Sequence, residues 1–420
     1  MNKQLLHTVE GLRDIHVTDT IKKNAIEANI LGLFNHYGYE QIQTPTFEYY
    51  DIYHYERGTA DGKNLYKFFN REGEILALRP DVTPSIARYM ATFYNHKNDP
   101  MRFCYLGNVF YNNENYQGKL REYTQAGVEC IGLGNAEADG ESIALAVNAL
   151  RSSGLKEFQI DIGHAGFFKG LAQEAGFDEE MEEEVRKMID EKNYIGLEEL
   201  LDDLQLEEKT KKALIALPTL FGDVDVLKNA MALTNNEIAL EAVNRMKEVY
   251  EILTEYKVSQ YISFDLGMVS KLNYYTGIIF KGYTYDVGDS VVDGGRYDKL
   301  LDTFSYDAPA VGFAVKIDEL LNALTRQKIE IEVPRVNTLI IYNKEYRKTA
   351  IQLAESLRRQ GMTVELGING KTVEESVAYG KDKHIGGMMY LKDEDTVVLT
   401  NLANGDEQVA KLSDIVEGGL

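Results

Sequence analysis

Polar side chains that could bind a small ligand are concentrated in four separated stretches of this 420-residue chain. In LALRPDVTPSIARY, Asp81 and Thr83 follow a segment with the pattern of a strand. The second stretch is REYTQAGVECIG, the third is KLNYYTG with Tyr274 and Tyr275, and the fourth is DGGRYDKLL. If the fold brings these stretches together, two carboxylates, an amide and two tyrosine hydroxyls would surround one ligand.

The second stretch, Arg121–Gly132, alternates as a strand does between two chemically different faces. Because successive side chains on a strand point to opposite sides, Gln125 and Glu129 project from one face, and Gly127 would leave room between them. The other face carries residues suited to a core: Thr124, Ala126, Val128 and Cys130. A polar strand face usually meets water, so this strand alone does not predict a site.

Taken together, the polar groups suit a small cationic or zwitterionic ligand. A carboxylate can hold an α-ammonium group, and a donor paired with an acceptor can recognise the two nitrogens of an imidazole.

Composition restricts the classes of partner. The chain has 45 Lys+Arg and 67 Asp+Glu, a formal net charge of −22, and no gathering of basic residues, which disfavours nucleic acid as a partner. Cys104 and Cys130 are too few and too far apart for a disulfide framework or a zinc motif. No spacing of His, Asp and Glu suggests a metal site, so we expect neither a metal nor a cofactor.

The N-terminal segment lacks the apolar core of a signal peptide, and no apolar run approaches the ~20 residues that cross a bilayer. We therefore expect no membrane association and a cytoplasmic location.

The order of predicted elements favours an α+β fold. A helix is expected from Thr18 to Gly38 and another at Ala136–Ser152, among short strands that include Arg102–Phe110 and Glu122–Gly132. Residues 170–256 are charged and helically periodic, which predicts a helical insertion into an antiparallel sheet flanked by helices. Strands then resume, so residues 1–328 form one expected domain.

The C-terminal part is expected to form a second domain, residues 335–420. The segment Ile329–Pro334 has the composition of a linker. Beyond it, NTLIIYN, a helical segment and MTVELG form a β-α-β pattern, which is typical of a small α/β domain.

Five motifs resemble the catalytic core of class II aminoacyl-tRNA synthetases, specifically histidyl-tRNA synthetase. HYGYEQIQTPTFEYYDIY resembles the dimer-forming motif 1, LRPDVT resembles LRPEGT, and FYNNENYQGKLREYTQAGVE resembles the motif 2 loop. KLNYYTG resembles the histidine-binding RGLDYYTG, and PAVGFAVKIDEL resembles motif 3. The resemblance covers roughly Glu10 to Leu324 and implies the class II fold.

This resemblance implies a histidine-binding site made of residues that match the family's motifs one by one. Asp81 stands where the family has glutamate, one methylene longer, and Thr83 stands at its threonine. The remaining positions implied by the motifs are Arg121, Gln125, Glu129, Tyr274 and Tyr275.

Three positions depart from the family where it uses arginine to form the adenylate. They hold Tyr111 in motif 2, Ser270 before the tyrosine pair, and Glu319 in motif 3. Adenylation needs fixed positive charge at the reacting phosphate, and losing one such donor typically costs ~3 kcal/mol. We expect negligible synthetase activity.

A histidine pocket without the adenylation arginines resembles the synthetase paralogue that serves as regulatory subunit of ATP phosphoribosyltransferase. This implies a non-catalytic role in the first step of histidine biosynthesis, with histidine as effector. The implied partner is the short-form catalytic subunit, in a hetero-oligomer that contains a homodimer. Two alternatives remain: a functional histidyl-tRNA synthetase, or another paralogue that binds a different amino acid.

Overall fold

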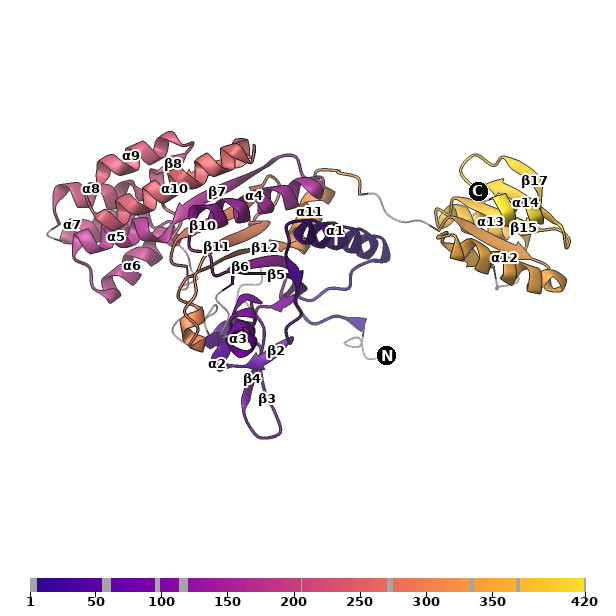
Figure 1. The fold of residues 1–420 in the computed structure, drawn as a ribbon, viewed down its shortest axis with the longest axis horizontal. Helices are drawn as coiled ribbons and strands as arrows, with labels where there is room; N and C mark the ends of the chain where they lie inside the picture. Colours follow the sequence, from indigo (N-terminus) through magenta and orange to yellow (C-terminus); the bar gives the residue numbers. More distant parts are fainter. Residues whose placement is uncertain are drawn as a thin grey trace. The chain divides into compact units, whose positions relative to one another are not determined.

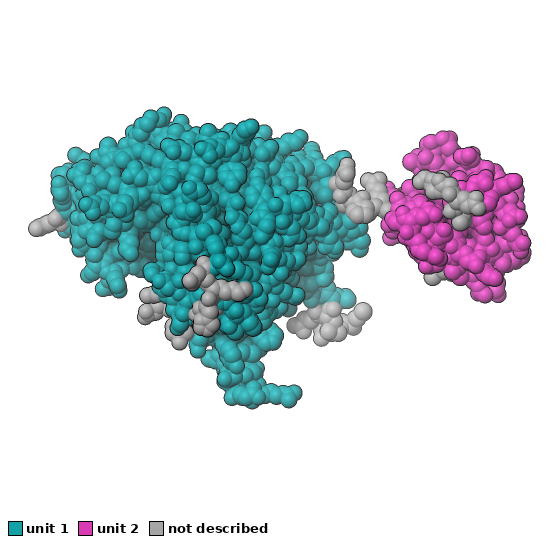
Figure 2. All heavy atoms as spheres, in the orientation of Figure 1, with its two compact units in different colours: residues 1–331 teal, residues 332–420 magenta. Residues whose placement is uncertain are grey.

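The computed structural model describes residues 6–54, 62–94, 99–112, 120–204, 206–269, 275–331, 336–367 and 371–418. The chain forms two compact units, Met1–Ile331 and Glu332–Leu420 (Figure 2). The first unit contains the stretches with the candidate site residues.

A nine-stranded sheet forms the centre of the first unit (Figure 1). Its neighbours pair antiparallel except β1 with β5 and β7 with β9, which are parallel, so the expected antiparallel sheet is mixed at these two places. In spatial order the strands are β1 (Glu40–Gln41), β5 (Met101–Phe110), β6 (Glu122–Ile131), β12 (Ala310–Lys316), β11 (Val292–Arg296), β10 (Ile278–Thr284), β7 (Phe158–His164), β9 (Ile262–Asp265) and β8 (Phe221–Gly222).

One face of this sheet is covered by the helices α1 (Val17–His36), α4 (Ala136–Ser152) and α11 (Ile317–Arg326) (Figure 1). Helix α4 has the predicted bounds, and the Asn135 side chain caps it by accepting a hydrogen bond from the Ala138 N–H. As predicted, Ala126, Val128 and Cys130 of β6 face this apolar core.

The other face of the sheet carries α3 (Thr83–Phe93) and a small sheet, β2 (Phe47–Tyr49), β4 (Ile75–Leu78) and β3 (Lys67–Phe69), with the short helix α2 (Asp51–His54). A second apolar cluster, which includes Val82, Ile86, Tyr105 and Tyr297, fixes α3 against the sheet. This cluster therefore holds the start of α3 above β5 and β6.

The predicted helical insertion lies at the β8 end of the sheet (Figure 1). Asp178, Asn193 and Asn236 each cap a helix of this region with a side-chain oxygen, which is how the charged sequence starts successive helices. The helices are α5 (Ala165–Ala175), α6 (Glu179–Asp190), α7 (Tyr194–Asp203), α8 (Glu208–Ala216), α9 (Asp225–Leu233) and α10 (Glu237–Glu255).

The second unit contains a five-stranded sheet in the order β14-β13-β15-β16-β17. The predicted β-α-β unit is present, since β13 (Thr338–Tyr342) and β14 (Val364–Leu366) pair in parallel on either side of α12 (Arg347–Arg359) in the sequence. The remaining elements are α13 (Val373–Asp382), β15 (Gly387–Leu391), β16 (Thr396–Asn401), β17 (Glu407–Lys411) and α14 (Leu412–Gly418). The α+β architecture predicted from the sequence is confirmed.

Candidate functional site

Strand register brings residues from the separated stretches onto the sheet face that lies opposite α1, α4 and α11. On β6 and β12, Glu129 pairs with Gly312, and Gln125 pairs with Lys316. On β12 and β11, Gly312 pairs with Gly295. Because directly opposed residues in a sheet share a face, the side chains of Glu129, Gln125 and Lys316 lie on one surface.

Two glycines make space for larger groups on this surface. A Cβ at Gly312 would collide with the carboxylate oxygen Oε2 of Glu129. A Cβ at Gly295 would lie 2.6 Å from Cε1 of the Tyr275 ring. Glycine at these positions therefore lets the Glu129 carboxyl and the Tyr275 ring lie close against the strands.

Glu129 is the most deeply buried acidic group of the candidate set, with 2% of its surface exposed. The Thr83 hydroxyl donates to its Oε1 over 2.6 Å, and the Tyr297 hydroxyl donates to its Oε2. Burial raises the pKa of Glu129 to about 8, although both hydroxyl donors lower it. The carboxyl is thus held in place by two side chains and is poised to titrate near neutral pH.

Asp81 and Thr83 lie together at the start of α3. The Thr83 backbone N–H donates to Oδ1 of Asp81 over 3.3 Å, and Asp81 acts electrostatically to raise the pKa of Glu129. The loop before α3 thus places two acidic groups, Asp81 and Glu129, around one threonine hydroxyl.

The space expected at Gly127 is occupied by the ring of Tyr105. A Cβ at Gly127 would collide with the phenol end of that ring. Tyr105 comes from β5, where it pairs directly with Gly127. The groups of Gln125 and Glu129 are therefore separated by an aromatic ring and not by an open gap.

The other candidate residues are placed as follows. Tyr275 is half-buried and packs against the second apolar cluster, while Tyr274 lies outside the described residues. Arg121 precedes β6. Its side-chain stem packs over Gly11, and its backbone N–H donates to the Gly11 carbonyl over 2.8 Å.

Tyr105, Tyr297 and Lys316 join this surface although the sequence did not single them out. Tyr297 lies in the fourth polar stretch, DGGRYDKLL, directly after the charged Arg296, and this position was the available signal that its side chain faces the site. Tyr105 and Lys316 end up beside the site only through strand register, which no local pattern encodes.

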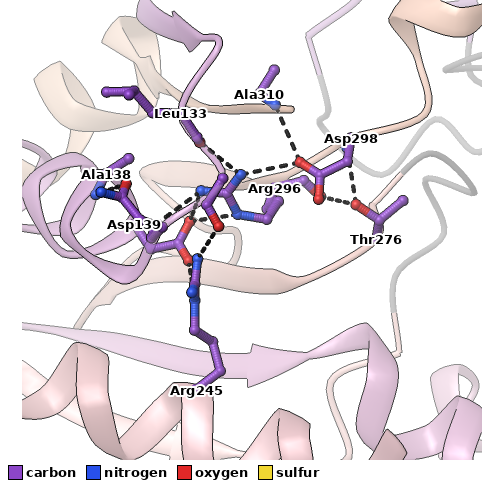
Figure 3. A network of polar contacts seen from close by, with 10 residues as sticks. Leu133, Ala138, Asp139, Arg245, Thr276, Arg296, Asp298 and Ala310 are labelled. Atoms are coloured by element: carbon purple, nitrogen blue, oxygen red, sulfur yellow. Dashed lines mark hydrogen bonds and ion pairs between the residues drawn. The ribbon is translucent and has the colours of Figure 1, made fainter. Parts of the chain in front are cut away.

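Figure 3 shows a buried ion-pair network around Arg296. Because Arg296 follows Gly295, which shares the face of Glu129, its side chain lies on the opposite face of the sheet from the candidate site. Asp139 on α4 has a fully buried side chain, and its Oδ1 accepts from Arg296 Nε over 2.8 Å while its Oδ2 accepts from Arg245 Nε over 2.8 Å. Arg245 belongs to α10, so the network joins the insertion to the sheet. Asp298 continues it, since Arg296 Nη1 donates to its Oδ1 and its own N–H donates to Thr276 Oγ1.

Two of the three positions where the synthetase family uses arginine lie within the described residues. Tyr111 follows β5, and its N–H donates to the Arg121 carbonyl over 2.9 Å. Glu319 lies in the first turn of α11, and Ser270 lies outside the described residues.

No helix in the described part of the chain is long and apolar enough to cross a membrane.

Comparisons with known proteins agree with this architecture. The sequence model of the histidyl-tRNA synthetase family matches residues 11–320. An ATP phosphoribosyltransferase regulatory subunit of Acetivibrio thermocellus is 42% identical over 98% of this chain and 99% of its own length. The one of Ruminiclostridium cellulolyticum is 40% identical over 96% of both chains.

Among solved structures, a Bacillus halodurans protein described as an ATP phosphoribosyltransferase regulatory subunit/histidyl-tRNA synthetase superposes with a TM-score of 0.82 at 35% identity. The match covers 92% of this chain and 98% of that one. This confirms the class II synthetase-like fold that the motifs implied. The chain belongs to the family of ATP phosphoribosyltransferase regulatory subunits, which is built on the histidyl-tRNA synthetase fold.

Proposed function

We propose that this protein is a non-catalytic regulatory subunit that assembles with the short-form catalytic subunit of ATP phosphoribosyltransferase and binds histidine as the feedback effector. Histidine is the end product of the pathway whose first step this enzyme catalyses. Binding at one site that changes activity at another corresponds to a coupling free energy of about 1–3 kcal/mol.

The observation that carries the proposal is the environment of Glu129. This carboxyl is buried and fixed by Thr83 and Tyr297, and it lies on the same sheet face as Gln125, close enough to Asp81 for that carboxylate to raise its pKa. A ligand that donates an N–H to a carboxylate in such a site gains a strong, charge-assisted hydrogen bond. The imidazole of histidine supplies that N–H, and its α-ammonium supplies a cation for the second carboxylate.

The buried amide of Gln125 supports a polar ligand on the same sheet face. Its Oε1 is buried and has no hydrogen-bond partner in the described part of the chain. Leaving such an acceptor unpaired costs roughly 1–3 kcal/mol, and a ligand donor would recover that free energy.

The alternative of a functional synthetase is disfavoured by Tyr111 and Glu319. Glu319 adds negative charge where a nucleotide triphosphate would need positive charge. A paralogue that binds a different amino acid is the other alternative, and the ligand titration below distinguishes it.

The experiment has two parts. In the first, histidine is titrated calorimetrically into the wild type and into Glu129→Gln, with glutamine and lysine as control ligands. We expect the wild type to bind histidine but neither control ligand. Glu129→Gln should bind histidine at least tenfold more weakly, a loss of ~1.4 kcal/mol. Absence of histidine binding, both alone and with the catalytic subunit, would contradict the effector role.

In the second part, the protein is co-purified with a short-form catalytic subunit, and ATP phosphoribosyltransferase activity is measured with and without histidine. We expect a hetero-oligomer that contains a homodimer of this chain, and inhibition by histidine that Glu129→Gln weakens. Failure of the two proteins to co-purify would contradict the partner.

A further inference from the structure

A cavity of about 600 Å³ lies in the first unit beside the helical insertion. Residues of α5 and α10 line it on one side, and Arg296 lines it on another. The Arg296 side chain lies on the opposite face of the sheet from Glu129, so this cavity is distinct from the candidate histidine site. Its volume is in the range that holds a small molecule.

Small residues bring α5 and α10 close together where they line the cavity. A Cβ at Gly166 would lie 3.5 Å from the Cβ of Ala242, and both residues belong to the lining, where they form what is here called the floor. Helix α5 begins at this point, because its N-cap residue His164 accepts the Gly166 N–H at Nδ1 over 3.0 Å. The positive end of the α5 dipole therefore lies at the floor, which favours a bound anion.

The His164 ring lines the cavity as a hydrogen-bond donor. Because Nδ1 accepts a hydrogen bond, the neutral ring carries its proton on Nε2. Burial and the positive charges of Arg245 and Arg296 lower the pKa of His164 to about 4, so the ring is neutral at pH 7. Nε2 has no hydrogen-bond partner within the described ranges of the chain, so its N–H remains for a ligand.

Two cationic side chains of the insertion also line the cavity. Arg245 donates from Nε to Asp139 and from Nη2 to the Gly134 carbonyl, each over 2.8 Å, and its Nη1 has no partner among the described residues. Lys169 on α5 is exposed and forms no ion pair with any residue that the structure describes. His164, Arg245 and Lys169 thus each present a donor that the protein itself does not use.

Acidic side chains at the mouth of the cavity limit the charge of its ligand. Glu241 and Glu248 lie one helical turn before and one turn after Arg245 on α10, and both are exposed. Asp298 also lines the cavity, but its Oδ1 already accepts from Arg296 and from the Ala310 N–H. The two glutamates repel a ligand that extends several negative charges out of the cavity.

We infer that this cavity is a second ligand site, in which one small oxyanion accepts hydrogen bonds from His164 Nε2, Arg245 Nη1 and Lys169 Nζ. The site lies outside the proposed histidine site, and the inference does not depend on histidine binding. Charge-assisted hydrogen bonds from a guanidinium and an ammonium are about twice as strong as neutral ones, and carboxylates and phosphates are the oxyanions that accept them. The glutamates at the mouth exclude polyphosphates from this class.

The test uses the full-length protein and two probes, inorganic phosphate and acetate. The phosphorus NMR signal of phosphate and the methyl proton signal of acetate are followed as protein is added at constant ionic strength. The variants are Lys169→Met and His164→Asn, since asparagine retains a side-chain oxygen that can cap α5 but loses the ring donor. Lys212→Met is the matched control, because Lys212 is an exposed lysine of the insertion on α8, outside the cavity lining. Circular dichroism establishes that each variant is folded.

We expect the wild type and Lys212→Met to broaden the signal of at least one probe to the same extent. Each of the other two variants should weaken the binding of that probe roughly tenfold, as expected for the loss of one charge-assisted hydrogen bond. The probe that binds more tightly identifies the ligand as a phosphate or a carboxylate.

The absence of broadening for both probes with the wild type would overturn the site. Equal binding by the wild type, Lys169→Met and His164→Asn would place the anion elsewhere and overturn it as well. An equal loss of binding in Lys212→Met would show attraction to positive charge in general and would also contradict the inference. Tighter binding of tripolyphosphate than of phosphate would overturn the ligand class set by Glu241 and Glu248.

Discussion

Arg296 and Tyr297 are consecutive residues whose side chains are held on opposite sides of the sheet. Arg296 is paired with Asp139 in the buried network, whereas Tyr297 donates its hydroxyl to Glu129 in the candidate site. Arg245 on α10 shares Asp139, so the segment Arg296–Tyr297 contacts both the network that reaches the helical insertion and the candidate site.

The first prediction concerns Asp139. Because Arg296 has a side chain that is 5% exposed, Asp139→Ala would leave a buried guanidinium without its main counter-ion. We expect the free energy of unfolding to fall by about 3–5 kcal/mol, measured by urea denaturation followed by circular dichroism. Glu183→Ala on α6, which removes an exposed pair with Arg186, is the control and should cost less than about 1 kcal/mol. Equal losses in the two variants would contradict the role of the network.

The second prediction is a pH dependence of stability that Glu129 causes. Its pKa is about 8 in the folded state and near 4.5 when unfolded, so between these values the folded state binds more protons than the unfolded state. The free energy of unfolding must then fall as pH rises through this interval, by at most about 1.4 kcal/mol per pH unit from this group. Glu129→Gln removes the titration and should flatten the dependence between pH 5 and pH 8. Parallel stability curves for the two proteins would rule this out.

The third prediction is that the isolated protein forms no histidyl-adenylate. Tyr111, Ser270 and Glu319 replace three arginines of the resembled synthetases, and each lost donor costs roughly 3 kcal/mol at the reacting phosphate. Histidine-dependent exchange of labelled pyrophosphate into ATP should stay at background. Exchange above background that Glu129→Gln abolishes would favour the synthetase alternative.

The fourth prediction is a two-fold homodimer built on the region from Ile26 to Tyr53. Ile26, Ile30 and Phe34 of α1 are buried within their own unit, so within this region we expect β2 to supply the contact. Phe47 and Tyr49 on β2 are 50% and 53% exposed, and Phe69 on β3 is 71% exposed. An isologous interface can cover such an apolar face.

Light scattering at micromolar concentration should give the mass of a dimer, and Phe47→Glu with Phe69→Glu should shift it toward the monomer. Phe221→Glu is the matched control, because Phe221 is 53% exposed but lies in the insertion. A monomeric wild type would count against the dimer.

Local patterns and motifs were enough to predict individual helices, strand faces and the fold. The bounds of α4 were predicted from the sequence, and the two faces of β6 followed from alternation. The apolar segment PAVGFAVKI, in contrast, gives no reason to expect its lysine beside Gln125. Lys316 lies beside Gln125 only because β12 pairs with β6 in that register, and a shift of one residue would place it on the other face.

Tyr105 illustrates the same limit. Gly127 was expected to leave room between Gln125 and Glu129, but the ring of Tyr105 from β5 fills that space, because Tyr105 pairs directly with Gly127. Packing between distant segments decides such contacts, so they were beyond a single-sequence prediction.

The last prediction links histidine binding to proton release. At pH 7 the Glu129 carboxyl, with a pKa of about 8, is mostly protonated in the ligand-free protein. An imidazole N–H donated to this carboxyl favours its ionised form, which lowers its pKa and releases up to one proton. The heat of binding should therefore differ between phosphate and Tris buffers, because the buffer that takes up the proton contributes its own ionisation enthalpy. Glu129→Gln, titrated at concentrations high enough to saturate it, should lose most of that difference. If the wild-type heats were the same in both buffers, the ligand would not be drawing a proton from Glu129, and the imidazole would not donate to this carboxyl.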